Sequence, residues 1–135
     1  MIRRWWLILG VLLASCGSAE IVAPGALVVV DTFPGQGAVV DPGEVPIVVA
    51  FSEAVDPGSL EDGVTVAVTS RTGAVMRQLD IALDDYDRDR FTATYTVEAF
   101  PADATFLLTV DDATVVATSR ARLAAPVERR FTTTP

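Results

Sequence analysis

Residues 28–60 read VVVDTFPGQGAVVDPGEVPIVVAFSEAVDPGSL, a stretch in which apolar runs alternate with turn residues. The two turns, at 33–37 and 41–44, combine Pro, which presets φ, with Gly, which tolerates positive φ. Every second residue of 45–51 is apolar. A period of two residues is typical of a strand with one buried face, so this stretch predicts two strands separated by tight turns.

The same alternation continues to the end of the chain, and no long helical period appears. The predicted strands are residues 27–31, 45–51, 63–69, 74–83, 91–97, 104–110 and 127–133. Residues 52–63 are expected to form a loop, with or without one helical turn, and residues 84–89 an acidic turn. About seven short strands with regular turns indicate an all-β fold, an antiparallel β-sandwich with a small barrel as the alternative.

The alternation also assigns a face to each side chain. Val64, Val66 and Val68 are expected in the core, and Thr65 and Thr69 on the outside. The other expected core positions are Val45, Ile47, Val49, Phe51, Leu79, Ile81, Leu83, Phe91, Ala93, Tyr95, Val97, Phe106, Leu108 and Val110.

The first fifteen residues have the parts of an export signal. Arg3 and Arg4 form a positive segment, and an apolar run of ten residues follows from Trp5 to Ala14. Ten residues fall well short of the roughly 20 that a membrane-spanning helix needs, and they fit the apolar core of a signal peptide. We therefore predict a signal peptide at 1–15, a tether at 16–25 and a folded domain at 26–135.

The signal ends in Leu13-Ala14-Ser15-Cys16, which resembles the lipobox of bacterial lipoproteins. This resemblance implies cleavage before Cys16 and lipidation of its thiol, so that acyl chains anchor the protein to a membrane. Cys16 is the only cysteine, and lipidation accounts for an odd cysteine in an exported chain. An ordinary signal peptide with an incidental cysteine is the alternative. Gly17 is not the Asp that often marks inner-membrane retention, which implies the outer membrane in a cell with two membranes.

Composition excludes several classes of function. The chain has no His, Lys or Asn, so its serines lack the usual activating bases, and we expect no enzyme and no cofactor. After residue 15 the chain carries eight arginines and eighteen acidic residues. This charge repels nucleic acid, which is therefore not an expected partner.

The sequence DYDRD places three carboxylates at alternate positions, on Asp85, Asp87 and Asp89. A calcium-binding loop begins in the same way. The rest of such a loop is missing, because Arg90 stands where Gly is needed and Thr96 where a bidentate Glu is needed. We therefore predict a solvated hairpin tip and no metal site, with Asp85, Asp87 and Asp89 kept as a weak calcium candidate.

Three landmarks in the sequence resemble those of the bacterial Ig-like domain of S-layer (SbsA-type) proteins and of other multidomain surface proteins. The most specific landmark is a strand that runs into FSEAVDP, residues 51–57, and the weaker ones are Gly73 in the middle hairpin and the closing Phe-Thr-Thr at 131–133. The resemblance implies an Ig-like sandwich over nearly the whole chain after Cys16. The family often has Tyr where this chain has Phe106, and its Asp-x-x-Gly-Asn turn is missing from 119–126.

The FSEAVDP signature has a structural interpretation and a functional one. Phe51 would anchor the core, Glu53 and Asp56 would accept hydrogen bonds from loop N–H groups, and Asp56-Pro57 would start a turn. A ligand site on this loop is the alternative.

The sequence leaves three hypotheses for the function of the protein. The first is a lipid-anchored structural or interaction module of the cell envelope, with an envelope protein as partner through a sheet edge or the end loops. The second is a glycan-binding module, which is disfavoured because both Trp residues precede Cys16 and Tyr95 is expected to be buried. The third is a calcium-stabilised adhesin domain, which rests on the acidic hairpin alone.

Overall fold

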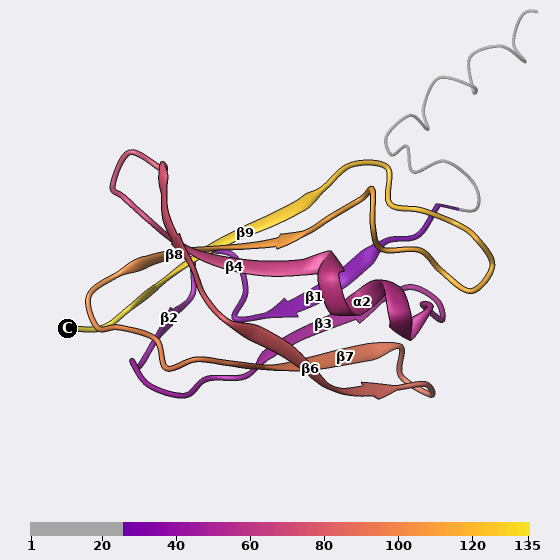
Figure 1. Ribbon diagram of the computed structural model, residues 1–135, viewed down its shortest axis with the longest axis horizontal. Coiled ribbons are helices and arrows are strands. Elements are labelled where there is room, and N and C mark those ends of the chain that lie inside the picture. Colours follow the sequence, from indigo (N-terminus) through magenta and orange to yellow (C-terminus); the bar gives the residue numbers. More distant parts are fainter. Residues whose placement is uncertain (1–25) are drawn as a thin grey trace, which may run out of the picture.

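The computed structural model describes residues 26–135, and Figure 1 shows them as two sheets packed face to face. The four-stranded sheet, in spatial order, contains β1 (Val29–Phe33), β3 (Ile47–Phe51), β7 (Thr92–Val97) and β6 (Ile81–Asp87). The five-stranded sheet contains β2 (Val39–Val40), β9 (Val127–Thr133), β8 (Thr105–Val110), β4 (Val64–Thr69) and β5 (Val75–Gln78).

This strand order is the order of an immunoglobulin sandwich. The strands β1, β3, β7 and β6 take the places of A, B, E and D, while β9, β8 and β4 take those of G, F and C, with β5 as C′. All pairs are antiparallel except the two-residue β2, which runs parallel to β9. The predicted all-β Ig-like sandwich is therefore confirmed, with β2 added and one predicted strand divided.

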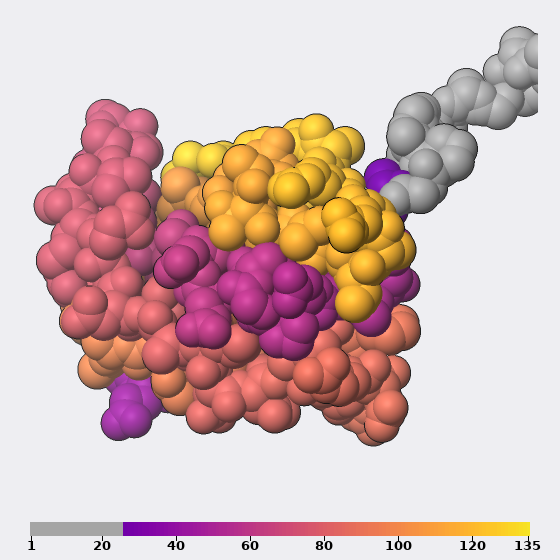
Figure 2. Space-filling view, turned by 45° about the vertical axis from the view of Figure 1, so that its right-hand side comes forward, coloured from indigo at the N-terminus to yellow at the C-terminus, as the bar shows by residue number. Residues whose placement is uncertain are grey.

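One short helix, α2 (Pro57–Gly63), joins β3 to β4 and so connects the two sheets. Asp56 caps it by accepting a hydrogen bond from the Gly58 N–H, and Pro57 occupies its first position, where an N–H is not needed. In Figure 2 the helix, in magenta, lies between the 111–126 loop above it and the strands below it. No helix among residues 26–135 is long and apolar enough to cross a membrane.

The core lies between the sheets, where the inward positions of every long strand meet. Phe106, Phe131 and Phe100 form an aromatic cluster, with ring centroids 5.1 Å apart for Phe106–Phe131 and 4.8 Å for Phe100–Phe106. Burying one such side chain contributes about 1.5–3 kcal/mol. The nine strands and this single continuous core lie within residues 26–135.

The predicted strand at 74–83 was wrong, because the chain changes sheets within it. Strand β5 ends at Gln78 in the five-stranded sheet, and β6 begins at Ile81 in the four-stranded sheet. Leu79 fills the crossover and is buried, while the Asp80 N–H donates to Glu98 Oε1 at 2.8 Å. Leu79, Ile81 and Leu83 stay in phase across the crossover, and no Pro or Gly marks it, so the sequence contained no turn signal there.

The acidic turn predicted at 84–89 was also placed too early. Strand β6 continues to Asp87, and the turn occupies residues 88–91. Phe91 belongs to this turn with φ +53° and is half-buried, so it is not a strand residue of the core. A register shift between Leu83 and Asp85 allows the strand to continue.

The faces of β4 follow the prediction at its start and depart from it at its end. Val64 and Val66 are buried and Thr65 is exposed. Val68, opposite Phe106, is only half-buried, whereas Thr69, which pairs with Thr105, is 4% exposed. The Thr69 hydroxyl donates to the Thr105 carbonyl oxygen at 3.5 Å, and the residue lies at the edge of a hollow at this end of the sandwich.

Candidate functional site

The described chain enters the sandwich beside the loop that joins β8 to β9. The Leu27 N–H donates to the Arg122 carbonyl oxygen at 3.1 Å, and Leu27 pairs with Leu123 in an isolated bridge. The β4–β5 hairpin and the C-terminus lie at the opposite end of the long axis (Figure 1). Cys16, the predicted lipidation site, and the predicted segments 1–15 and 16–25 lie outside the described residues.

The FSEAVDP signature fastens the β8–β9 loop to the sandwich. The Ser119 hydroxyl donates to Glu53 Oε1 at 2.6 Å, and the Thr118 N–H donates to the Ala54 carbonyl oxygen at 2.9 Å. Asp56 caps α2, as expected of a turn-starting residue. Glu53 accepts from a hydroxyl and not from the predicted N–H group. These contacts support the structural interpretation of the signature.

The β8–β9 loop, residues 111–126, closes one end of the core. Three of its own residues, Val115, Ala117 and Leu123, are buried in the core. Its tight turn is made by the Ala117 N–H, which donates to the Ala121 carbonyl oxygen at 2.9 Å, with Arg120 at φ +80°. A non-glycine residue therefore adopts the left-handed conformation in this turn.

Asp111 begins this loop and is used to fix it. Its carboxylate accepts a hydrogen bond from the Thr114 hydroxyl at 2.6 Å and from the Ala113 N–H at 3.2 Å. Both hydrogen bonds hold the pKa of Asp111 below its usual range, and the bond from the Thr114 hydroxyl has the larger effect. The carboxylate therefore acts as a loop cap.

The acidic hairpin carries the three carboxylates of the calcium candidate. Asp85 and Asp87 belong to β6, and Asp89 belongs to the following turn. Asp87 Oδ1 accepts from the Asp89 and Arg90 N–H groups at 2.9 and 3.1 Å, which closes the turn. Within residues 26–135 no group of three or more carboxylate, thiol or imidazole side chains is arranged to hold a metal ion.

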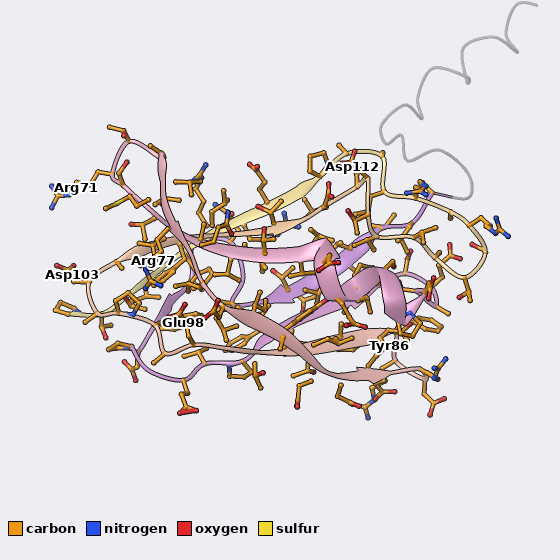
Figure 3. The ribbon with its side chains drawn as sticks, viewed as in Figure 1. Arg71, Arg77, Tyr86, Glu98, Asp103 and Asp112 are labelled. Carbon is orange, nitrogen blue, oxygen red and sulfur yellow. The ribbon has the colours of Figure 1, made fainter. Side chains whose placement is uncertain are left out.

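Neither tyrosine presents a stacking platform for a sugar ring. Tyr95 is buried, as predicted, and its hydroxyl donates to the Leu60 carbonyl oxygen at 2.8 Å. Burial raises the pKa of Tyr95 above its ordinary value. Tyr86 is half-buried beside α2 (Figure 3), and its hydroxyl oxygen accepts the Val55 N–H at 2.8 Å. Both rings are thus committed to holding the β3–β4 connection.

A polar hollow at the end opposite the chain entry was not anticipated from the sequence. It has a volume of about 610 Å³, and a second hollow of about 300 Å³ adjoins it. The two share Thr69, Ser70, Arg71 and Thr105, so we treat them as one groove, the hairpin groove. The hairpin groove is further lined by Thr72, Gly73, Met76, Asp103, Thr132 and Arg130.

The residues of the hairpin groove come from three parts of the chain that the fold brings together. Arg71 lies on the β4–β5 hairpin, Asp103 on the β7–β8 loop and Arg130 on β9. Figure 3 shows Arg71 and Asp103 at the same end of the sandwich, and Figure 2 shows the hairpin as a lobe that projects beside the later strands. In the sequence these residues look like ordinary outward strand and turn positions.

The free sheet edges are each built to resist pairing with another strand. Strand β2 has two residues. Strands β1 and β5 are interrupted by register shifts that leave Val30 and Met76 unpaired in their ladders. Strand β6 carries exposed Asp84 and Asp85 along its edge. Bulges, charges and short length are the usual protections of an edge strand, so the end loops are better suited to recognition than the edges.

The strand order, the parallel β2–β9 pair and the signature contacts define an Ig-like domain, and comparison with known proteins identifies the family. A model of the bacterial Ig-like domain family matches residues 23–133. The chain belongs to this family. No curated protein matches the chain.

Solved structures resemble this bacterial Ig-like domain in fold. The structure of CopC from Methylosinus trichosporium OB3b has a TM-score of 0.58 at 13% identity, over 81% of this chain and 94% of that one. The S-layer protein rSbsC(31-844) has a TM-score of 0.56 at 14% identity, over 79% of this chain and 13% of that one. The structure of SbsC domains 1–6 has a TM-score of 0.51 at 14% identity, over 79% of this chain and again 13% of that one.

Proposed function

We propose that the protein is a lipid-anchored module of the cell envelope, in which Cys16 holds a single Ig-like domain at a membrane. The domain acts as a structural or protein-interaction module and not as an enzyme. The lipobox at residues 13–16 directly before a short tether is the observation that carries this proposal. Membership of the bacterial Ig-like family and the likeness to S-layer domains support a place at the cell surface.

The point at which the chain enters the sandwich indicates which end of the domain would lie nearer to the membrane. A ten-residue tether spans at most about 35 Å when fully extended. Because the chain joins the sandwich beside the β8–β9 loop, the β4–β5 hairpin end would point away from the membrane. The outward end loops would then meet the partner, since the sheet edges are protected.

Fractionation of cells tests the anchor, with the full chain as the parent and a variant that combines Cys16→Ser with an ordinary cleavable signal peptide in place of residues 1–15, so that the apolar run is removed from both proteins. We expect the parent protein in the membrane fraction, resistant to extraction with high salt, and the variant in the soluble fraction. Density separation of the two membranes tests the outer-membrane assignment implied by Gly17. A variant that remains membrane-bound would refute lipid anchoring through Cys16.

Capture of envelope proteins by the chain from Ala19 onward, with and without calcium, tests the interaction module. This segment contains all the described strands and the whole core. A specific partner that is lost on changing residues of the 70–74 hairpin, and kept on changing residues of β6, would support recognition through the outward end loops. A strict requirement for calcium would favour the acidic hairpin as a metal site.

A further inference from the structure

The hairpin groove combines two arginines, a row of hydroxyl groups and one carboxylate. We propose that it binds a sugar unit that carries a single oxyanion, a carboxylate or a phosphate, with Arg71 and Arg130 contacting the anion. This site is independent of the lipid anchor and adds a ligand to the domain.

The hairpin groove brings two arginines together in an acidic chain. Arg71 and Arg130 are exposed and line the same 300 Å³ hollow, which no carboxylate lines. Among residues 26–135 the one ion pair within 4.0 Å is Arg77 with Glu98, so neither arginine of the groove is neutralised by an acidic neighbour. A planar guanidinium presents paired N–H groups that match the oxygens of a carboxylate or a phosphate.

The hairpin that carries Arg71 is held in one shape. The Gly73 N–H donates to the Ser70 carbonyl oxygen, and the Ser70 N–H donates to the Ala74 carbonyl oxygen, both at 2.9 Å. The Ser70 hydroxyl also accepts the Ala74 N–H at 3.2 Å. Gly73 has φ +92°, and a Cβ at this position would lie 4.0 Å from both terminal nitrogens of Arg130. The tip of the hairpin and the Arg130 guanidinium are therefore neighbours.

The backbone of Arg130 is fixed independently of the hairpin. Its N–H donates to Gln36 Oε1 at 2.8 Å, and its carbonyl oxygen accepts the Gly37 N–H at 2.7 Å. The turn before β2 therefore locks this part of β9 in place. Both arginines thus extend from rigid backbone, while their side chains remain free to meet a ligand.

The larger hollow also has a carboxylate, Asp103, and the backbone around this residue is held in place too. The Asp103 N–H donates to the Thr134 carbonyl oxygen at 2.9 Å. The Thr133 hydroxyl donates to the Pro101 carbonyl oxygen at 2.7 Å and accepts the Ala104 N–H at 3.0 Å. The Asp103 carboxylate would accept hydrogen bonds from ligand hydroxyl groups and would repel a second anion.

The groups that line the groove select the ligand class. Arg130 lines the smaller hollow, Asp103 lines the larger one, and Arg71, Thr69 and Thr105 line both. A uronate or a sugar phosphate has one anion for the arginines and several hydroxyls for the threonines and Asp103, which matches this lining. A polymer with a phosphate on every unit would place a second negative charge next to the Asp103 carboxylate, which would repel it. Because neither tyrosine is available for stacking, recognition here depends on charge and hydrogen bonds.

Titration of the 15N-labelled chain from Ala19 onward, followed by NMR, tests the proposal. The probes are glucuronate, glucose 6-phosphate, glucose and inorganic phosphate, each up to about 50 mM, a range suited to a millimolar Kd. We expect saturable shifts of the amides at 70–73 and 103–105 with one of the two charged sugars, which identifies the anion. Glucose and inorganic phosphate should each bind at least about tenfold more weakly, equivalent to about 1.4 kcal/mol.

Matched arginine variants locate the site. Arg130→Gln and Arg71→Gln should each weaken binding of the charged sugar about tenfold, whereas Arg88→Gln, at the opposite end of the sandwich, removes the same charge and should leave the Kd unchanged. All three residues are exposed, so the variants are expected to keep the parent spectrum elsewhere. Equal weakening by Arg88→Gln would show a general charge effect and overturn the site.

Three other results would overturn the proposal. Absence of shifts at about 50 mM for both charged sugars excludes a ligand of this class at relevant affinity. Equal binding of glucose removes the role of the anion. Equal binding of inorganic phosphate shows a site for a simple ion, without recognition of the sugar.

Discussion

At the scale of single residues, Tyr95 and Gly63 show how the α2 connection is held against the core. Tyr95 was predicted to be buried from its place in an apolar alternation. Its hydrogen bond to the Leu60 carbonyl oxygen was not predictable, because it depends on the position of α2 over the sheet. In the sequence, Gly63 stood at the boundary between the predicted loop and the predicted strand. In the structure a side chain at this position would meet Val115.

We expect Gly63→Ala to lower the free energy of unfolding by about 1–3 kcal/mol, because the added methyl group overpacks the core. A Cβ at this position would lie 2.3 Å from Val115 Cγ2. Chemical denaturation checks the value. Gly58→Ala, whose Cβ would lie 3.6 Å from its nearest neighbour, Asp56 Oδ1, is the control and should cost less than about 0.5 kcal/mol. Equal effects of the two changes would contradict the close contact.

Tyr95→Phe should lower the free energy of unfolding by about 1–3 kcal/mol at neutral pH, because the Leu60 carbonyl oxygen loses its buried partner. Since burial raises the pKa of Tyr95 in the folded state, the folded protein holds this proton more tightly than the unfolded chain. The parent should therefore lose stability as the pH rises above about 10, by up to about 1.4 kcal/mol per unit.

Denaturation curves at several alkaline pH values separate the two tyrosines. The alkaline loss should disappear in Tyr95→Phe and persist in Tyr86→Phe. A steep loss that survives in Tyr95→Phe would assign it to another group.

At the scale of elements, the sequence predicted most strands within a few residues, because period-two alternation reports a half-buried strand directly. It failed where two strands share one alternation. Residues 74–83 read as a single strand, yet the chain passes from the five-stranded to the four-stranded sheet within them. The crossover is set by a contact from a distant strand end, since Glu98 accepts both the Asp80 N–H at 2.8 Å and Arg77 Nη1 at 3.1 Å.

Glu98→Ala should therefore loosen the crossover. The hydrogen bond from the Asp80 N–H has the largest effect in lowering the pKa of Glu98, and the charge of Arg77 lowers it further. The contact is thus present at neutral pH and is lost as the pH falls through this lowered pKa. Hydrogen exchange, compared as protection factors, should show the Asp80 amide at least about tenfold less protected in the variant.

Glu128→Ala removes an exposed carboxylate from β9 and is the matched control. Protection of Asp80 should be unchanged in this variant. Equal protection of Asp80 in the parent and in Glu98→Ala would show that the crossover is held by packing of Leu79 alone.

At the scale of the whole molecule, the fold was predictable and the groove was not. The FSEAVDP signature and the strand spacing led to the Ig-like sandwich, and the structure explains the signature as the fastening of the β8–β9 loop. The hairpin groove is assembled from a hairpin, a loop and a strand that meet only after folding. Sequence patterns report which face a residue occupies, and they do not report which distant residues share an end of the sandwich.

A lipid-anchored envelope module depends most directly on the state of Cys16. Mass spectrometry of the mature protein, extracted from membranes of cells that express the full chain, measures this state in one step. We predict an N-terminal peptide that begins at Cys16 and carries the added mass of a diacylglyceryl group and an acyl chain. A mature protein that begins at another residue, or that retains an unmodified Cys16 thiol, would contradict the lipid-anchored envelope module.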